Sequence, residues 1–313
     1  LPRPTGDGIG TIEYNSNLAH LYAHFVRHTI DTSLEGLTIV YDGANGAASS
    51  VGPEILSGLG AKVININVNP DGLNINDHCG STHIEGLQVA VQQHNADLGI
   101  ANDGDADRCL LVDEKGQVLD GDQIMLLCAL KLKEEGKLKD DTVVGTVMSN
   151  IGFHKAAEEL GMKTVSTAVG DRYVLEYMRE HNLSVGGEQS GHVIFLDHNT
   201  TGDGMLTAVQ VAALMKEKNQ PLSELAGIMT KYPQVLINVR VATKTGWEDN
   251  DIIKAAIVTA EGELGDEGRV LVRASGTEPL IRVMAEGPNQ EELQALCQEI
   301  ADIIGREQGL AEK

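Results

Sequence analysis

The chain has 313 residues, of which 42% are hydrophobic and 22% are charged, a composition typical of a folded globular protein. Because this length exceeds the range in which a single core keeps growing, we expect two or three domains. The formal net charge of −22 disfavours binding to nucleic acid or anionic lipid. The net charge does not exclude a small phosphorylated ligand, which a local arginine cluster or a metal ion can attract.

The sequence carries no clear membrane or disulfide signal. Its longest apolar run, residues 124–130, is much shorter than the ~18 residues of a membrane span and predicts a core helix. The four cysteines are scattered without a Cys-x-x-Cys pair, which favours a reducing, cytoplasmic compartment over disulfides or structural zinc. The chain begins Leu-Pro-Arg-Pro without a signal peptide, and we interpret this start as a cut in a longer protein.

Helices and strands alternate over the first part of the chain. Asn15 and Ser16 precede a run of apolar residues at helical spacing and are predicted to cap that helix, and Gly60 ends the second one. The predicted helices cover residues 18–26 and 53–59, and the predicted strands cover residues 37–41, 63–68, 98–101 and 109–112. This order predicts a βαβ unit.

A similar order returns in the middle of the chain, and the last part differs from both. The middle strands are predicted at residues 142–147 and 163–167, with a helix at 153–160. The last part has strands at 233–241, 269–273 and 281–286, a helix at 250–261, and a final helix capped by Asn289 and followed by Gly305. We therefore predict two consecutive mixed-sheet α/β domains of similar plan (1–118 and 119–230) and a small α+β domain (231–313).

A short acidic loop at residues 103–108 reads Asp-Gly-Asp-Ala-Asp-Arg and lies between two predicted strands. Asp103, Asp105 and Asp107 can point to one side of an extended loop, where they would form a hard oxygen site suited to Mg²⁺. We favour this over a solvated acidic turn or an EF-hand calcium loop. An EF-hand would have glycine in place of Arg108, and helices as flanks.

A second loop, residues 186–192, reads Gly-Gly-Glu-Gln-Ser-Gly-His. Its glycines allow a ligand to approach the backbone, and its carboxylate, amide and hydroxyl suit the hydroxyls of a sugar. A glycine-rich hairpin without ligand is the alternative. His192 is a candidate general acid or base, or a hydrogen-bonding wall of the site.

A third loop, residues 273–282, brackets hydroxyl side chains and a glycine with two arginines. Arg273 and Arg282 supply guanidinium groups, and Ser275, Gly276 and Thr277 supply hydroxyl and backbone donors, which together suit a phosphate group. The alternative is a surface hairpin with paired arginines. A metal site, a hydroxyl-reading loop and a phosphate loop on three domains suggest a hexose phosphate held at both ends.

These loops resemble those of the α-D-phosphohexomutase superfamily, in order and spacing, over essentially the whole chain. Residues 103–108 look like its metal loop, residues 187–192 like its sugar loop and residues 273–282 like its phosphate loop. The resemblance covers the second, third and fourth of the family's four domains. It implies Mg²⁺ on the three aspartates and an intramolecular phosphotransferase reaction.

Within the superfamily, the chain looks most like the bacterial phosphoglucosamine mutases. The Glu-Gln-Ser form of the sugar loop and residues 169–174 and 200–204 carry this resemblance. Phosphomannomutase/phosphoglucomutase relatives, which stay open as an alternative, usually have Met in place of Gln189. The resemblance implies interconversion of glucosamine 6-phosphate and glucosamine 1-phosphate, on the route to UDP-N-acetylglucosamine, through a phosphoserine and glucosamine 1,6-bisphosphate or a similar hexose bisphosphate.

The resemblance also implies roles for individual residues. Arg108 would steady the transferring phosphoryl group, and Glu188 and Ser190 would hold sugar hydroxyls in both orientations. The non-reacting phosphate would be held by Arg273, Ser275, Gly276, Thr277 and Arg282.

The sequence departs from the family in one important respect. The family's phosphoserine lies in a Ser-His-Asn-Pro type loop of its first domain, and no such motif occurs here. In addition, Ala168 stands where some relatives carry Lys, which leaves the general acid and base open. We weigh a trimmed mutase, inactive alone, against a serine-less sugar-phosphate-binding module, and favour the first. Family dimers depend largely on the first domain, which is compatible with a monomer here.

Overall fold

The computed structural model describes residues 3–15, 17–276 and 278–309. Its chain divides into two compact units, one formed by Leu1–Lys131 and Ser190–Ala226 and the other by Leu132–Gln189 and Gly227–Lys313.

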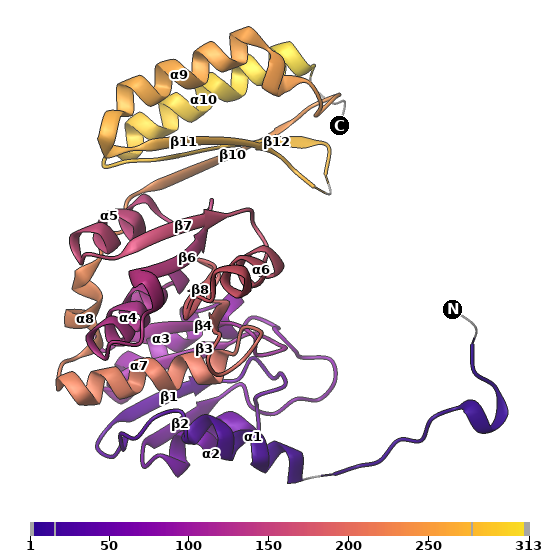
Figure 1. Cartoon of the computed structure of the whole chain (residues 1–313), viewed down its shortest axis with the longest axis vertical. Coiled ribbons are helices and arrows are strands. Elements are labelled where there is room, and N and C mark those ends of the chain that lie inside the picture. Colours follow the sequence, from indigo (N-terminus) through magenta and orange to yellow (C-terminus); the bar gives the residue numbers. More distant parts are fainter. Residues whose placement is uncertain (1–2, 16, 277, 310–313) are drawn as a thin grey trace. The chain divides into compact units, whose positions relative to one another are not determined.

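The first unit contains a five-stranded mixed sheet with the order β2-β1-β3-β4-β5 (Figure 1). Its strands are β1 (Thr38–Asp42), β2 (Lys62–Ile66), β3 (Leu98–Asn102), β4 (Cys109–Asp113) and β5 (Val118–Leu119). The first three are parallel, whereas β4 and β5 run antiparallel to their neighbours. The short turn between β3 and β4 is the acidic loop, so both of its ends are fixed by the sheet.

The helices of the first unit each have an apolar face to bury. They are α1 (Asn17–Arg27), α2 (Val51–Gly58), α3 (Glu85–His94), α4 (Gly121–Glu134), α7 (Gly204–Lys218) and α8 (Leu222–Leu225), and the short strand β9 (Val193–Phe195) precedes α7. Leu87 and Val91 of α3 pack on Val40 and Val112 of the sheet. All residues from 204 to 215 of α7 are buried, as expected for a helix that is apolar on every side.

The second unit contains two separate sheets. In the first, β6 (Thr142–Thr146) pairs in parallel with β7 (Lys163–Thr167) and β8 (Val185–Gly187). The connecting helices are α5 (Ile151–Glu159) and α6 (Asp171–His181). This strand–helix–strand order is the one predicted for the middle of the chain.

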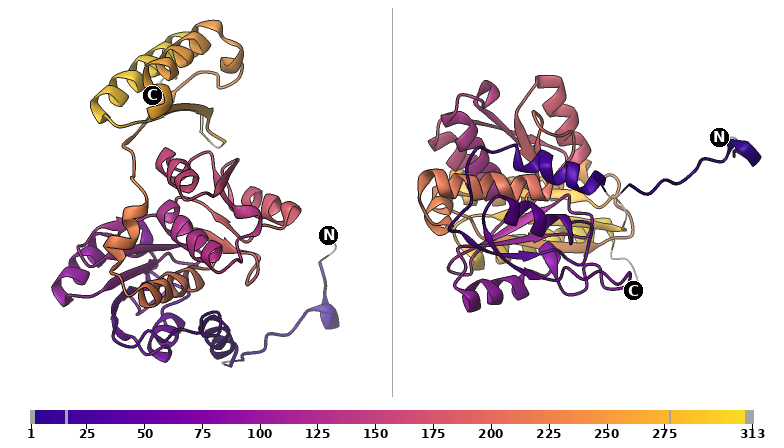
Figure 2. Two further views of the ribbon diagram at one scale, coloured as in Figure 1. Left: turned by 60° about the vertical axis from the view of Figure 1, so that its left-hand side comes forward. Right: turned by 90° about the horizontal axis from the view of Figure 1, so that it is seen from below.

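The second sheet of this unit is antiparallel, with the order β10-β12-β11. Its strands are β10 (Gln234–Arg240), β11 (Arg269–Ala274) and β12 (Leu280–Glu286). The helices α9 (Asp251–Leu264) and α10 (Gln290–Gln308) lie side by side over one face of it (Figures 1 and 2). Apolar residues of both helices and of the strands form a single core, including Val283, Leu293 and Ile300.

The predicted fold class is confirmed, with mixed α/β sheets followed by a small α+β portion. The Asn289 cap is confirmed as well, since its side chain accepts hydrogen bonds from the backbone N–H groups of Glu291 and Glu292. The prediction that Gly305 ends the last helix is wrong. Gly305 is buried inside α10, which continues to Gln308 and ends at Gly309, whose φ of 70° suits glycine.

Asn15 Oδ1 accepts a hydrogen bond from the Asn17 N–H at 3.0 Å at the start of α1, while the predicted cap Ser16 lies outside the described residues. None of the helices in the described part of the chain is both long enough and apolar enough to cross a membrane.

Candidate functional site

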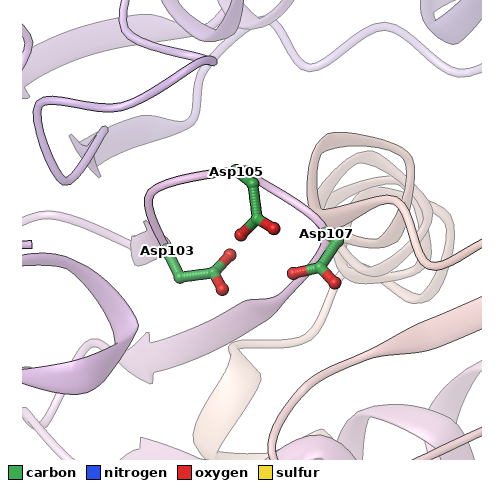
Figure 3. Close-up of side chains that lie close together, drawn as sticks. All are labelled: Asp103, Asp105 and Asp107. Carbon is green, nitrogen blue, oxygen red and sulfur yellow. The ribbon is translucent and has the colours of Figure 1, made fainter. Parts of the chain in front are cut away.

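The acidic loop brings three carboxylates together between β3 and β4. One oxygen from each of Asp103, Asp105 and Asp107 lies within 4.8 Å of the others, and Figure 3 shows the three side chains gathered on the inner side of the loop. Asp103 is buried, Asp107 is partly buried and Asp105 is exposed. The flanks are strands, as the magnesium interpretation of this loop assumed.

Buried hydrogen bonds hold the backbone of this loop. The side chain of Asn102 donates to the carbonyl of Arg108 at 2.8 Å, and it accepts a hydrogen bond from the Tyr41 hydroxyl at 3.0 Å. Gly204 N–H donates to the carbonyl of Ala106 at 2.9 Å. The carboxylates are therefore placed by the sheet and by the start of α7 before any ligand binds.

The electrostatics of the loop favour a cation. Burial, together with the nearby Asp107 carboxylate, raises the pKa of Asp103 to about 6. Arg108 offsets this only in part, since its Nε lies 3.6 Å from Asp103 and 3.9 Å from Asp107. Asp107 Oδ1 is buried without a hydrogen-bond partner among the described residues. A set of hard oxygen donors with one unsatisfied atom fits Mg²⁺.

His192 is fixed against this loop by both of its ring nitrogens. Its Nε2 lies 3.0 Å from the Gly202 N–H, which must donate, so Nδ1 carries the ring proton and donates to Asp107 Oδ2 at 3.0 Å. The ring is almost completely buried. A side chain on Gly202 would overlap the His192 ring, which explains why glycine stands there. His192 therefore contacts the acidic loop through Asp107.

A cavity of about 500 Å³ opens beside the aspartates in the first unit. Tyr22, Ser50, Asp105, Asp107 and Asp203 are among its lining residues. The Tyr22 hydroxyl donates to Asp203 Oδ1 at 2.7 Å, and Asp203 also caps α7. The exposed carboxylate of Asp105 therefore borders a space that a small ligand can enter.

The residues of the predicted sugar loop belong to both units, because the division falls between Gln189 and Ser190. Glu188, at the end of β8, accepts a hydrogen bond from the Gly170 N–H at 3.0 Å, which ties it to the start of α6. Ser190 is exposed in the first unit. Arg172, also at the start of α6, is exposed and pairs with Glu176 at 2.7 Å.

The predicted phosphate loop is the turn of the β11–β12 hairpin. Arg273 and Arg282 occupy paired positions of the two strands, and burial together with Arg282 lowers the pKa of Arg273. Ser275 is buried and Gly276 is exposed. The Ser275 hydroxyl accepts a hydrogen bond from the Glu278 N–H at 3.3 Å. Thr277, the remaining predicted donor, lies outside the described residues.

Sequence reasoning missed several residues that support these loops. Lys244, after β10, donates to three carbonyls of the phosphate loop. Tyr41 and Asn102 support the acidic loop from within the first sheet. No local motif marks these residues. Their partners are distant in sequence or are backbone atoms, so only the folded chain reveals them.

Comparison with known proteins identifies the family. Family models described as "Phosphoglucomutase/phosphomannomutase" match three consecutive segments: alpha/beta/alpha domain II at residues 13–116, alpha/beta/alpha domain III at residues 120–232 and the C-terminal domain at residues 236–303. The acidic loop, the sugar loop and the phosphate loop each fall within a different one of these segments.

Curated relatives narrow this assignment. The phosphoglucosamine mutase of Geobacillus thermodenitrificans is 52% identical over 310 residues, which is 99% of this chain and 69% of the relative. That of Bacillus subtilis is 51% identical over 310 residues, with the same coverage. The chain belongs to the phosphoglucosamine mutases, isomerases of the phosphohexomutase superfamily, and the predicted family and enzyme class are confirmed. It spans about two thirds of the length of these relatives.

Solved structures agree on the fold. A phosphoglucomutase/phosphomannomutase family protein from Burkholderia thailandensis superimposes with a TM-score of 0.78 at 20% identity, over 94% of this chain and 66% of its own. The N-acetylphosphoglucosamine mutase of Aspergillus fumigatus, in complex with GlcNAc-6P and magnesium, gives a TM-score of 0.72 at 24% identity, over 90% and 68% of the two chains.

Proposed function

We propose that this chain supplies the metal, sugar and phosphate sites of a mutase that interconverts glucosamine 6-phosphate and glucosamine 1-phosphate. The observation that carries the proposal is the aspartate cluster held ready between β3 and β4. The arginine-bearing hairpin of the second unit supports it, because it suits a phosphate group. The family's solved complex with GlcNAc-6P and magnesium is consistent with both.

In this proposal, Asp103, Asp105 and Asp107 hold Mg²⁺, which supplies charge neutralisation for phosphoryl transfer when bound. Arg108, beside Asp103 and Asp107, stabilises negative charge on the transferring group. His192 acts as a hydrogen-bond donor to Asp107 and keeps that carboxylate oriented, because both ring nitrogens are already engaged. This favours the hydrogen-bonding role over the general acid or base role.

The sugar and the second phosphate are bound by the other two loops. Glu188 and Ser190 accept and donate hydrogen bonds to sugar hydroxyls. Arg273 and Arg282 bind the non-reacting phosphate, with Ser275, Gly276 and Thr277 as hydroxyl and backbone donors. This binding energy fixes the geometry of the reacting end. A hexose bisphosphate, such as glucosamine 1,6-bisphosphate, is the proposed intermediate, and the A. fumigatus enzyme has been solved with glucose 1,6-bisphosphate.

We further propose that the protein acts in the cytoplasm, on the route to UDP-N-acetylglucosamine. We also propose that the chain consists of three domains with boundaries near residues 118 and 231. All four cysteines are free and buried, which suits a reducing compartment. Since the sequence contains no Ser-His-Asn-Pro motif, we propose that these 313 residues alone bind phosphosugar without converting it.

Titration calorimetry with Mg²⁺ tests the metal site. The Asp105→Asn variant is expected to weaken Mg²⁺ binding at least about tenfold, since one of three anionic ligands becomes neutral. Asp31→Asn removes an exposed carboxylate of the same unit and should leave binding unchanged. Equal Mg²⁺ affinity in the Asp105 variant and the wild type would refute the assignment.

Titration with phosphosugars, in the presence of Mg²⁺, tests the substrate. Glucosamine 6-phosphate should bind more tightly than glucose 6-phosphate or mannose 6-phosphate. A preference for either hexose phosphate would instead support a phosphomannomutase/phosphoglucomutase activity.

A further inference from the structure

The loop that follows β10 places a lysine under the phosphate loop. Lys244 Nζ lies 2.6 Å from the carbonyl oxygen of Ser275, 3.3 Å from that of Glu278 and 3.4 Å from that of Gly276. Its three N–H donors therefore all have a carbonyl of one short turn within reach. We propose that Lys244 is a positioning residue for phosphate recognition, an inference that rests on the proposed function of this loop.

The shortest of these bonds identifies what Lys244 orients. In a trans peptide the C=O and N–H groups point in opposite directions. Because the Ser275 carbonyl points at Lys244, the N–H of the same peptide, which belongs to Gly276, points away from the lysine. That N–H is the backbone donor assigned above to the phosphate. A side chain built on Gly276 would meet no atom within 4 Å, so the space beside this residue is open to a ligand.

The charge of the ammonium strengthens this arrangement. A cation that hydrogen-bonds a carbonyl polarises the peptide, which makes its N–H a better donor. It also adds positive charge behind a site that Arg273 and Arg282 already make positive. Lys244 thus attracts a phosphate and shapes the turn that receives it, without being one of the residues expected to touch the ligand.

The position of Lys244 is itself fixed by its neighbours. The hydroxyls of Thr243 and Thr245 lie 3.1 Å apart, and the Thr245 N–H donates to the Thr243 hydroxyl at 3.4 Å. On the N-terminal side, Val241 N–H donates to the carbonyl of Pro279 at 3.1 Å. The segment that carries Lys244 is thereby attached to the same hairpin that the lysine supports.

Two measurements on the 313-residue chain test this role. The first is titration calorimetry with glucosamine 6-phosphate, and the second is backbone amide hydrogen exchange over residues 273–280. Lys244→Met keeps the length of the side chain but removes its charge and donors. It is expected to weaken binding about tenfold or more, as for loss of a charge-assisted hydrogen bond. It should also speed exchange of the Ser275 and Glu278 N–H groups, which donate to the Leu280 carbonyl and the Ser275 hydroxyl.

Two variants serve as controls. Lys254→Met removes an exposed lysine of α9 in the same unit, so it matches the loss of net charge and should change neither measurement. Lys244→Arg keeps a cation with several donors and should weaken binding less than Lys244→Met does. If Lys244→Met does not fold, Lys244→Arg serves as the test. It is then expected to bind more weakly than the wild type and to exchange faster in the turn.

The outcomes separate this role from the proposed function. Wild-type exchange rates at Ser275 and Glu278 in Lys244→Met would refute the positioning role. Equal loss of binding in Lys254→Met and Lys244→Met would also refute it, because net charge alone would then explain the effect. If the wild-type chain bound no phosphosugar, the proposed function would fail, while the exchange measurement would still decide whether Lys244 holds the turn.

Discussion

Arg273 and Arg282 face each other across β11 and β12, as a directly paired position of the antiparallel ladder. Like charges at such a position destabilise a sheet, and the lowered pKa of Arg273 reflects burial together with this neighbour. Glu278 compensates in part, since one of its oxygens lies 3.6 Å from Arg282. The hairpin therefore holds an excess of positive charge that an anion can neutralise.

Replacing one of these arginines should separate binding from stability. Arg273→Gln is expected to weaken glucosamine 6-phosphate binding by roughly 10–100-fold, the effect of losing a hydrogen bond to a charged group. It should leave the thermal stability of the ligand-free chain unchanged or slightly higher, because the repulsion from Arg282 is removed. Calorimetry and thermal unfolding of the same samples measure both effects.

The control for this variant is Arg240→Gln, which removes an exposed guanidinium from β10 of the same sheet. It should bind the phosphosugar as the wild type does. A large loss of thermal stability in Arg273→Gln, with binding retained, would show that Arg273 has a structural role and does not bind phosphate.

The chemistry-bearing loops could be predicted from sequence because each is a short run of unusual residues. The three aspartates alternate along six residues, and the two arginines bracket a single turn. The strands beside them are apolar runs, so their places at strand ends were also predictable. What the sequence could not show is the support of these loops. Lys244 donates to backbone carbonyls more than thirty residues away. Because every residue has a backbone carbonyl, the residue types do not show which carbonyls a lysine will contact.

Two other differences have the same origin in packing. The role of His192 could not be chosen from sequence, because it depends on the Gly202 N–H and on Asp107, which only the fold brings to its two nitrogens. Gly305 satisfied the local rule for a helix stop, yet it is buried within α10. The helix packs against β10 and β12, and Gln308, beyond Gly305, is still buried, so tertiary context overrides local propensity.

His192 should affect metal binding through Asp107. In His192→Ala, Asp107 loses the donor that orients it, and Mg²⁺ affinity is expected to fall by about 10-fold or more, as for other residues that hold metal ligands. His192→Asn places an amide donor near the position of Nδ1 and should retain more affinity. Calorimetric titration of both variants with Mg²⁺ provides the measurement, and equal affinities for the Ala variant and the wild type would contradict this role.

Glu286 is expected to be essential for the stability of the second unit. It is fully buried at the end of β12 and accepts hydrogen bonds from Arg269 Nε at 2.7 Å, from the Ile151 N–H at 2.9 Å and from the side chain of Gln234 at 3.0 Å. Glu286→Gln removes the carboxylate that pairs with Arg269, which keeps its hydrogen bond to the Ser149 carbonyl, and breaking a buried ion pair costs about 3 kcal/mol.

Chemical denaturation should therefore show a lower free energy of unfolding in Glu286→Gln. Glu299→Gln, on the exposed side of α10, is the matched control and should unfold as the wild type does. Wild-type stability in the Glu286 variant would mean that the Arg269 pair contributes little to joining α5 with the C-terminal sheet.

His154 in α5 should make the second unit sensitive to mild acid. Burial, aided by the charge of Arg269, lowers the pKa of His154 from 6.5 to about 4, and its Nδ1 lies 2.8 Å from the Thr164 hydroxyl. The unfolded chain therefore binds a proton between these two pH values while the folded chain does not, so stability falls as the pH drops from about 6.5 to about 4. Because the ring is partly exposed, we expect a loss on the order of 2 kcal/mol.

His154→Gln removes the titrating group and should flatten this part of the stability profile, measured by urea denaturation at several pH values. His94→Gln, on an exposed histidine of α3, should keep the wild-type slope, and an unchanged slope in His154→Gln would assign the acid sensitivity to other groups.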